Sequence, residues 1–321
     1  MPRFQVLLTD YAWPDLQIER RILQQVDAEL VVAPPDAQDP ASLAALARDH
    51  QVDAIMTNWA KVPARVIDAS PKLQIVCRLG IGLDNIDVAH CTQRGIPVTN
   101  VPDYCLNEVA EHTVALLLAL ARKVAWYHHA TKTGRYALQE GPRLRRIEGQ
   151  TLGIIGLGNI GRRVAIKAQA LGLRTIAATR SIREVPPGVT VLPLNQLLET
   201  SDYVSLHVPL TPQTRHMIGA AELKRMKPTA YLINTARGGL IDHAALAETL
   251  AAGGLAGAAL DVQDPEPPDL TSPPYCDPRV IVTPHAAFVS EESLADLRSR
   301  VAQQIVQKLT GVRPAHIVNG L

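Results

Sequence analysis

The chain has few aromatic residues and no excess of charge of either sign. Aromatic side chains make up 4% of the 321 residues, and 32 lysines and arginines are balanced by 31 aspartates and glutamates. Proteins that bind nucleic acids usually carry a basic excess, and many stack bases on aromatic rings. The composition therefore argues against a nucleic acid or an acidic surface as partner. We interpret the one arginine cluster, at residues 143–146, as a solvated loop.

Cysteine is scarce as well, and its spacing predicts no covalent or metal framework. The four cysteines are scattered along the chain without close pairing: Cys77, Cys91, Cys105 and Cys276. Disulfide scaffolds and structural zinc sites are typically recognised by regularly spaced cysteines. We therefore expect no metal site, and a reducing compartment.

Long hydrophobic runs are also missing. The longest one in view, Val114 to Leu120, is bracketed by His112 and Arg122, whereas a membrane-spanning helix needs roughly 20 apolar residues. The apolar part of the amino terminus, Phe4 to Leu8, is too short for a signal peptide. We therefore expect a cytoplasmic protein without a membrane partner.

Short β-rich runs alternate with helical patterns along the chain. Such alternation predicts parallel sheets with right-handed crossovers, and a chain of this length suffices for about two domains. We therefore predict an α/β protein with two doubly wound parallel-sheet domains, one before and one after a helix at 108–123. The predicted strands are 4–8, 30–33, 54–57, 73–79 and 97–100 in the first series and 152–155, 175–178, 203–208, 230–234, 257–262 and 280–283 in the second, and a last helix covers 291–309.

Three polar side chains lie just beyond predicted strands of the second series. They are Arg237, Glu266 and His285. Ligands of open α/β sheets bind at the carboxyl ends of the strands. Each residue taken alone is equally typical of a turn, a solvated loop or a strand end. The prediction of a functional site therefore depends on all three sharing one edge of one sheet.

These side chains supply what the reduction of a 2-keto acid requires. The guanidinium of Arg237 can grip a carboxylate through two parallel hydrogen bonds and keeps its charge. An imidazole titrates near neutral pH, so His285 can give a proton to the carbonyl oxygen or take it back. The carboxylate of Glu266 favours the charged imidazolium. We therefore predict that Arg237 binds substrate, that His285 is the acid and base, and that Glu266 is its partner.

A glycine fingerprint precedes these residues. It follows the strand at 152–155 and opens a helical pattern, which is the context that a dinucleotide-binding loop requires. Gly156 permits the tight turn, Gly158 lets a pyrophosphate approach the backbone, and Gly161 lets helix and strand pack closely. We therefore predict a Rossmann cofactor site that includes Gly156, Gly158, Asn159, Ile160 and Gly161.

Several motifs resemble the D-2-hydroxyacid dehydrogenase family. They are the segments 156–161, 234–239, 259–262 and 283–285, in family order. Within the family, the segments 101–105, 109–113 and 285–288 resemble the branch related to C-terminal-binding protein. The resemblance runs from about residue 50 to about residue 300, and it implies hydride transfer between a nicotinamide and C2 of a small 2-keto or 2-hydroxy acid.

The resemblance implies the same roles for Arg237, Glu266 and His285 and adds further contacts. Beside the expected cofactor path it places Thr113, His207, Pro209, Ala236 and Asp261, the last near the nicotinamide amide. A structural role for His207 and Thr113 stays open. In the first domain it implies that a substrate carboxylate meets the backbone around a small turn, at Arg78, Leu79, Gly80 and Ile81.

The resemblance also implies that the last helix returns to the first domain. A flavodoxin-like substrate domain would then be discontinuous, with residues 1–100 and 289–321, and the dinucleotide-binding domain would span 101–288, with a cleft between the two. The family pairs through its cofactor domain, and the segment 108–136 carries more apolar surface than a lone domain should expose. We therefore expect a homodimer.

The end of the strand at 175–178 bears on the choice between NAD and NADP. An acidic side chain at this place accepts hydrogen bonds from the ribose and repels a 2'-phosphate. Thr179 stands where the family usually has Asp, and Arg180, Ser181 and Arg183 offer charge and donors for a 2'-phosphate. We therefore predict that NADP (NADPH) is preferred, with NAD as the alternative if the arginines point away from the ribose.

The substrate and two other functions stay open. Thr57 and Asn58 depart from the Arg-Ser pair of relatives that use phosphorylated substrates, although Arg78 keeps such a substrate open. A dinucleotide-sensing binding protein similar to a co-repressor is one alternative, because a relative in the branch docks short peptides. Oxidation of another small oxyanion such as phosphite is the other. The complete catalytic set favours an enzyme that acts on 2-keto acids.

Overall fold

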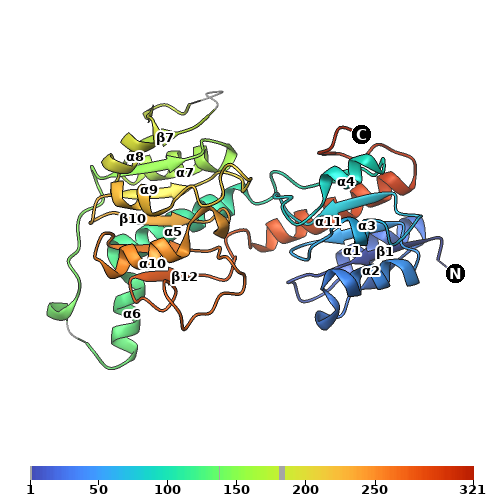
Figure 1. The fold of residues 1–321 in the computed structure, drawn as a ribbon, viewed down its shortest axis with the longest axis horizontal. Helices are drawn as coiled ribbons and strands as arrows, with labels where there is room; N and C mark the ends of the chain where they lie inside the picture. The colour runs from blue at the N-terminus through green and yellow to red at the C-terminus, as the bar shows by residue number, and fades with distance from the viewer. Residues whose placement is uncertain (1, 137, 181–184) are drawn as a thin grey trace. The chain divides into compact units, whose positions relative to one another are not determined.

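Two parallel sheets organise the chain, each in a unit of its own (Figure 1). The computed structural model describes residues 2–136, 138–180 and 185–321. The first unit comprises the residues up to Tyr104 together with Ser290–Leu321, and the second unit comprises Cys105–Val289.

The first unit contains a flavodoxin-like sheet. Its strands are β1 (Phe4–Leu8), β2 (Ala28–Val32), β3 (Ala54–Thr57), β4 (Ile75–Arg78) and β5 (Val98–Thr99). They lie in the order β2-β1-β3-β4-β5, and neighbouring strands are parallel. The connections change direction between β1 and β3, and the carboxyl ends at that point are where such sheets bind ligands.

Helices cover both faces of this sheet. They are α1 (Gln17–Leu23), α2 (Pro40–Asp49), α3 (Ala64–Ile67), α4 (Val88–Gln93) and α11 (Glu291–Leu309). Leu7 joins the apolar cluster under α2 and α3, whereas Val6 and Leu8 join the cluster under α1 and α11, because successive strand residues point to opposite faces. Burial on both faces explains why these strands read as continuous apolar runs in the sequence.

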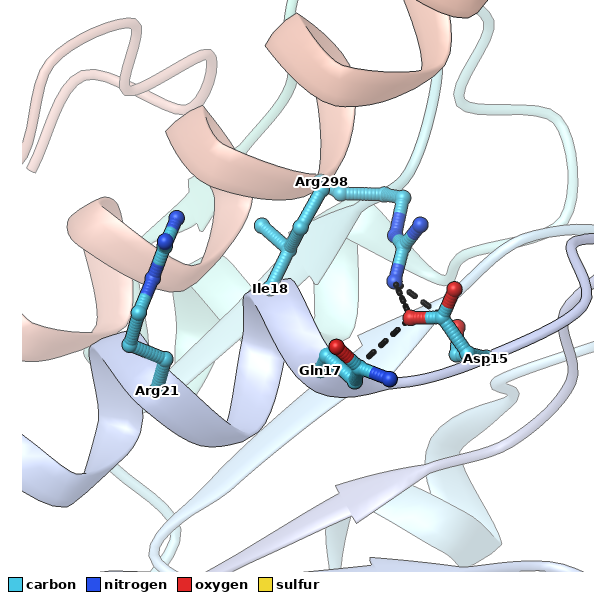
Figure 2. Close-up of a pocket in the computed structure, with 5 residues that line it drawn as sticks. All are labelled: Asp15, Gln17, Ile18, Arg21 and Arg298. Atoms are coloured by element: carbon cyan, nitrogen blue, oxygen red, sulfur yellow. Dashed lines mark hydrogen bonds and ion pairs between the residues drawn. The ribbon is translucent and has the colours of Figure 1, made fainter.

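A buried ion pair ties α11 to α1 within the first unit. Arg298 donates from Nε and Nη2 to the two carboxylate oxygens of Glu19, both at 2.8 Å. Glu19 has no accessible surface, Arg298 is 6% exposed, and its guanidinium lies over the Trp13 ring, 5.5 Å from the centroid. Arg298 also donates to the carboxylate of Asp15 at 3.1 Å (Figure 2). Asp15 and Arg298 line a pocket together with Gln17, Ile18 and Arg21.

The second unit contains a Rossmann-type sheet. Its strands are β6 (Thr151–Ile155), β7 (Arg174–Ala178), β8 (Val189–Val191), β9 (Tyr203–Leu206), β10 (Tyr231–Asn234), β11 (Gly257–Leu260) and β12 (Val280–Val282). They lie in the order β12-β11-β10-β9-β6-β7-β8, and neighbouring strands are parallel. The connections change direction between β6 and β9, which puts the expected ligand edge beyond these two strands.

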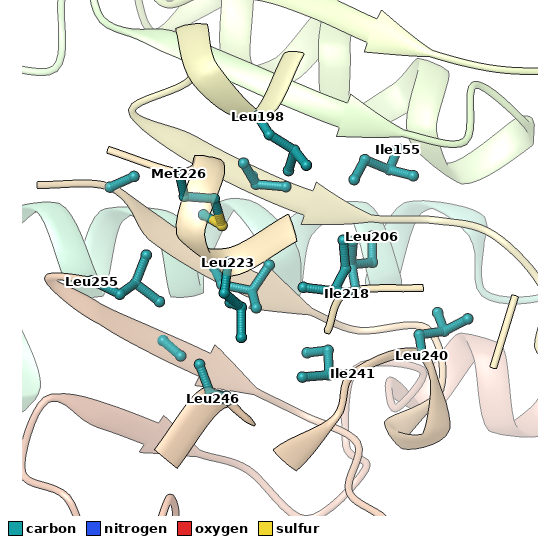
Figure 3. Packing of buried hydrophobic residues seen from close by; sticks show 14 of the residues in the cluster. Ile155, Leu198, Leu206, Ile218, Leu223, Met226, Leu240, Ile241, Leu246 and Leu255 are labelled. Atoms are coloured by element: carbon teal, nitrogen blue, oxygen red, sulfur yellow. The ribbon is translucent and has the colours of Figure 1, made fainter. Parts of the chain in front are cut away.

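The helices of the second unit also form two layers. They are α5 (Leu106–Arg122), α6 (Val124–Lys132), α7 (Asn159–Ala170), α8 (Leu194–Thr200), α9 (Ala220–Arg225) and α10 (His243–Ala251). Leu198, Leu223 and Leu246 bring α8, α9 and α10 onto one face of the sheet (Figure 3). Leu117 and Val164 bring α5 and α7 onto the other face. Short 3-10 helices lie at Gln24–Val26, Pro35–Ala37, Leu138–Glu140 and Gly238–Leu240.

The structure differs from the sequence expectation in details. The strand β8 was not expected, because its run has only three residues, and the centre of that run is exposed. The chain leaves the first unit after Tyr104 rather than at residue 100, since Val101 and Tyr104 pack against that unit's core. It returns after Val289 rather than after residue 288.

The described residues contain neither a membrane-spanning helix nor a cluster of metal-binding side chains. No helix in the described part of the chain is long and apolar enough to cross a membrane. Within residues 2–136, 138–180 and 185–321, no group of three or more His, Cys, Asp or Glu side chains is arranged to hold a metal ion.

The buried pair yields a stability prediction. Glu19→Gln leaves the charge of Arg298 buried with weaker compensation, and breaking a buried ion pair typically costs about 3–5 kcal/mol of unfolding free energy. The exposed pair Arg48–Asp49, 3.6 Å apart, is the matched control in the same unit, and Asp49→Asn should cost less than about 1 kcal/mol. Urea unfolding followed by circular dichroism measures both, and equal losses would contradict the structural role of Glu19.

Candidate active site

The glycine loop joins β6 to α7 at the change of direction of the second sheet. Gly156 has φ +98, its N–H donates to the Ala178 carbonyl at 2.9 Å, and a Cβ there would lie 2.4 Å from the His207 carbonyl oxygen. A Cβ at Gly161 would lie 2.1 Å from the Gly156 carbonyl oxygen. Packing within the fold therefore excludes side chains at both positions.

Gly158 is different, because the fold leaves room there. A Cβ at Gly158 would meet no protein atom within 4 Å, and the residue is the extended N-cap of α7. The loop thus offers open backbone in front of the first amides of a helix, whose dipole favours an anion. This arrangement fits the pyrophosphate of a dinucleotide. Asn159, exposed, and Ile160, half-buried, begin α7 beside it.

The end of β7 lies next to this loop. Ala178 pairs with Ile155, the last residue of β6, so Thr179 follows at the level of Gly156. Thr179 is half-buried and Arg180 is exposed. Neither is acidic, as the sequence indicated. Two other residues of the predicted 2'-phosphate site, Ser181 and Arg183, lie outside the described residues.

The residues expected beside the cofactor path differ in accessibility. His207 follows β9, and its Nε2 lies 2.8 Å from the Ser205 hydroxyl. Burial lowers the pKa of His207 to about 4, so it is neutral at neutral pH. Thr113 has no accessible surface, and its hydroxyl contacts Thr235 at 2.9 Å and donates to the Val109 carbonyl at 2.7 Å. The geometry thus gives Thr113 a structural part, and its contact with a cofactor stays a prediction.

Pro209 and Ala236 lie on two neighbouring loops of this edge. Pro209 is exposed, and its carbonyl accepts a hydrogen bond from the Thr214 hydroxyl at 2.7 Å. Ala236 is half-buried in the turn after β10, where its N–H donates to the Asn234 side chain at 3.0 Å. Both residues remain proposed cofactor contacts.

Asp261, directly after β11, organises the turn that carries His285. Its carboxylate has no accessible surface and accepts from the Thr283 hydroxyl at 2.6 Å and from the N–H groups of Ala286 and Ala287 at 2.8 and 3.0 Å. Burial raises the pKa of Asp261, but hydrogen bonds from these groups and from His112 outweigh it and lower the pKa overall. The predicted contact of Asp261 with a nicotinamide stays a prediction.

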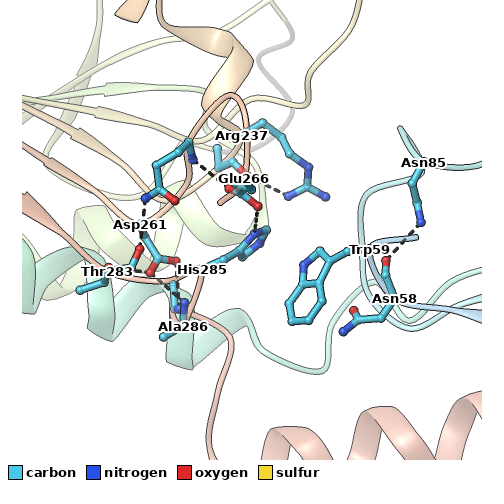
Figure 4. Close-up of polar contacts among 12 residues, drawn as sticks. Asn58, Trp59, Asn85, Arg237, Asp261, Glu266, Thr283, His285 and Ala286 are labelled. Carbon is cyan, nitrogen blue, oxygen red and sulfur yellow. Dashed lines mark hydrogen bonds and ion pairs between the residues drawn. The ribbon is translucent and has the colours of Figure 1, made fainter. Parts of the chain in front are cut away.

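His285 and Glu266 form a pair within the second unit (Figure 4). His285 Nδ1 lies 2.9 Å from Glu266 Oε2, and the two side chains are 21% and 32% exposed. Glu266 Oε1 accepts from the Gln263 N–H at 2.8 Å, so both carboxylate oxygens are engaged. The His285 backbone has φ 52, a conformation uncommon for a residue with a side chain. The ring meets Phe288 edge to face, with centroids 6.1 Å apart.

Arg237 is fixed against the same loop. The side chain of Asn234, at the end of β10, donates to the Arg237 carbonyl at 2.8 Å. A Cβ at the next residue, Gly238, would lie 2.0 Å from the Gln263 carbonyl oxygen. The backbone after Arg237 therefore touches the backbone that leads to Glu266. The sheet thus brings all three predicted catalytic residues to one edge of the second unit.

The first unit presents the predicted carboxylate site at the ends of β3 and β4. Arg78 is 6% exposed, and its Nη1 donates to the Asn58 side chain at 3.2 Å. A Cβ at Gly80, where φ is +152, would lie 2.7 Å from that Nη1. The Leu79 N–H donates to the Thr57 carbonyl at 2.8 Å. Leu79 therefore does not offer its amide to a substrate, because the amide completes the sheet, and the proposal rests on Arg78, Gly80 and half-buried Ile81.

The sequence analysis did not predict the residues that position the candidate substrate-binding and catalytic loops. Asp10, after β1, accepts from the N–H groups of Asn58 and Trp59 at 3.0 and 2.6 Å and so fixes the loop after β3. Gln263 donates from its side chain to the Leu260 and Thr283 carbonyls at 3.0 and 3.1 Å. The signal available in the sequence was a polar side chain within three residues of the end of a strand, which both residues share.

The fold and the glycine loop define a dinucleotide-binding α/β protein, and comparisons with known proteins identify its family. The model of the D-isomer specific 2-hydroxyacid dehydrogenase NAD-binding domain matches residues 114–287. A glyoxylate reductase of Korarchaeum cryptofilum is 40% identical over 293 residues, which cover 88% of this chain and 88% of that protein.

Two solved structures bear on the cofactor. An NADPH-dependent glyoxylate/hydroxypyruvate reductase from Sinorhizobium meliloti, in complex with NADP and malonate, has a TM-score of 0.85 and 31% identity over 98% of this chain and 97% of that chain. A D-lactate dehydrogenase from Aquifex aeolicus, complexed with NAD and lactic acid, has a TM-score of 0.87 and 26% identity over 99% of each chain.

The chain belongs to the D-isomer specific 2-hydroxyacid dehydrogenase family. It is an NAD(P)-dependent oxidoreductase that acts on CH–OH donors, and the comparisons do not favour a co-repressor-like protein or an enzyme that oxidises phosphite. The narrower resemblance to the branch related to C-terminal-binding protein stays a prediction.

His207 gives a prediction for stability against pH. Its pKa of about 4 in the folded chain lies below the ordinary value of 6.5, so the unfolded chain binds more protons between these two values. The free energy of unfolding should therefore fall as the pH falls from about 6.5 to about 4, by up to about 3 kcal/mol from this residue. His207→Gln should flatten the slope, and exposed His50→Gln should not. Identical slopes for His207→Gln and the wild type would refute the assignment.

Proposed function

We propose that Arg237, Glu266 and His285 catalyse the reversible reduction of a small 2-keto acid, with glyoxylate and hydroxypyruvate as the first candidates. The observation that carries this proposal is the His285–Glu266 pair at 2.9 Å, on the loop that touches the backbone after Arg237. The names of the relatives support the choice of substrates, since glyoxylate and hydroxypyruvate reductases are among them.

The role of each catalytic side chain follows from the hydrogen bonds that its atoms already make. A bound nicotinamide dinucleotide supplies the hydride. His285 Nδ1 is held by Glu266, so Nε2 is the nitrogen that gives a proton to the carbonyl oxygen in reduction and takes it back in oxidation. Glu266 stabilises the charged imidazolium and fixes the plane of the ring. Arg237 holds the substrate carboxylate by charge-assisted hydrogen bonds.

We also propose that NADPH is preferred over NADH. Thr179 stands at the end of β7 beside the glycine loop, where a carboxylate would repel a 2'-phosphate, and exposed Arg180 follows it. The two solved relatives hold NADP in one case and NAD in the other. Because these two relatives differ in cofactor, the proposal rests on Thr179 and Arg180 of this chain.

A homodimer through the second unit is proposed as well. Apolar side chains are exposed along and after α6: Val124 at 57%, Tyr136 at 92% and Leu138 at 82%. Large apolar side chains exposed to this degree are typical of a protein–protein contact when they lie together. A symmetric pairing would cover it.

Two variants test the catalytic pair. His285→Ala should lower kcat by about 10²–10⁴-fold, the usual contribution of a general acid, while the affinity for the reduced dinucleotide stays unchanged. Glu266→Gln removes the charge that favours the imidazolium, so the rate of reduction should begin to fall at a lower pH. Steady-state rates across a pH series on glyoxylate and hydroxypyruvate measure both. Wild-type rates and profiles in both variants would remove the assignment.

Cofactor choice is tested at Thr179. Thr179→Asp adds repulsion of a 2'-phosphate and an acceptor for the ribose, so it should shift the ratio of kcat/KM for NADPH and NADH by about tenfold or more toward NADH. Arg180→Ala should weaken NADPH binding selectively, and Arg174→Ala, at an exposed residue at the amino end of β7, serves as a comparison for general loss of positive charge. A wild-type ratio that favours NADH refutes the preference.

The dimer is tested by light scattering at micromolar concentration. The wild type should show twice the mass of one chain, and Val124→Asp should shift the equilibrium toward the monomer because it buries a charge at the contact. Ile166→Asp, at a residue 56% exposed in α7, is the control and should leave the mass unchanged. A wild-type monomer rules the dimer out.

A further inference from the structure

Glu266 lies on a segment that has no regular secondary structure to hold it. Residues 261–279, between β11 and β12, contain neither helix nor strand. Long irregular segments unfold locally more easily than the strands that they connect. Glu266 must nevertheless stay 2.9 Å from His285. Contacts between this segment and the rest of the second unit therefore help to hold the carboxylate in place.

Tyr275 supplies such a contact. Its hydroxyl hydrogen-bonds to Nδ1 of His243, and the two rings meet edge to face with centroids 5.5 Å apart at 69°. The Tyr275 N–H donates to the Ser272 carbonyl at 3.0 Å, and the ring packs against the core under α8, α9 and α10. The far part of the segment is thereby attached to the body of the second unit.

His243 lies a short distance along the chain from the turn of Arg237. It is the first residue of α10, and the Asp242 side chain caps this helix by accepting from the N–H groups of Ala244 and Ala245, both at 3.1 Å. Only the 3-10 helix Gly238–Leu240 and two further residues separate Arg237 from His243. The hydroxyl of Tyr275 thus bonds to the first residue of α10, the helix that follows the turn of Arg237.

The two partners are neutral near neutral pH. Burial lowers the pKa of His243, with the Gly238 backbone and the carboxylates of Asp264 and Asp242 acting the other way and His216 in the same direction. Burial also raises the pKa of Tyr275 to about 12. The contact is therefore a hydrogen bond that does not depend on a full charge on either side chain.

We propose that the Tyr275–His243 hydrogen bond positions Glu266 with respect to Arg237, a role that rests on the proposed function. The segment is held near its start, where Gln263 touches Gly238 and Asp264 accepts from Arg215 at 3.2 Å, and farther on at Tyr275. Glu266 lies between them. Tyr275 and His243 are positioning residues, and they act on the reaction through Glu266 and its hydrogen bond to His285.

Tyr275→Phe removes the hydroxyl and keeps the ring. Loss of one partly buried hydrogen bond of this kind should lower kcat by about tenfold, with the affinity for NADPH unchanged in a fluorescence titration. The pH at which reduction falls should move toward that of Glu266→Gln. The matched control is Tyr203→Phe, because Tyr203 is buried and stacked on Tyr231 at the amino end of β9, the opposite edge of the sheet. Its kcat and pH profile should equal those of the wild type.

Variants of the partner separate positioning from general packing. His243→Leu should reproduce the loss seen in Tyr275→Phe. His243→Asn keeps a polar atom near the position of Nδ1 and should retain most of the activity. In the Glu266→Gln background, Tyr275→Phe should cause no further loss, because the residue through which it acts is already altered.

The outcomes distinguish this proposal from the proposed function. Wild-type behaviour of Glu266→Gln overturns the catalytic assignment and the positioning role with it. A clear effect of Glu266→Gln together with a wild-type kcat and pH profile in Tyr275→Phe and His243→Leu overturns only the positioning role. An equal loss from Tyr275→Phe in the wild-type and Glu266→Gln backgrounds also overturns it, because the two residues would then act independently.

Discussion

The turn that presents His285 depends on one buried carboxylate, that of Asp261. It receives the Thr283 hydroxyl and the N–H groups of Ala286 and Ala287, and these bonds reverse the chain directly after β12. The reversal holds the His285 backbone at φ 52 and aims its ring at Glu266. A buried carboxylate without such donors would be strongly unfavourable, so the turn and the charge stabilise each other.

A second constraint joins the two halves of the site. The backbone at Gly238 lies so close to Gln263 that no side chain fits between them. Arg237 and Glu266 come from different strand ends, yet direct contact between their loops sets the distance between them. Residues outside the proposed catalytic set, such as Asn234 and Gln263, therefore help to determine its geometry. The proposed role of Tyr275 extends the same principle to the middle of the loop.

Local pattern was enough to predict most of the fold. Strands buried on both faces read as apolar runs, and α11 has the bounds that its periodicity indicated. The pattern failed at β8, which is short and only partly buried, so that its pairing with β7 rather than its own sequence makes it a strand. It also failed at Leu79, whose amide is used by the sheet, because hydrogen-bond partners across strands are not encoded locally.

The sequence by itself determined the class of fold, the glycine loop and the identity of the three candidate catalytic residues, because strand ends and glycines carry strong local signals. Only the tertiary structure decided what supports them. It paired Glu266 with His285 across a long loop, buried Asp261 and Thr113 among partners distant in the chain, and bonded Tyr275 to His243. Those contacts arise from packing between segments far apart in sequence, and no local pattern records them.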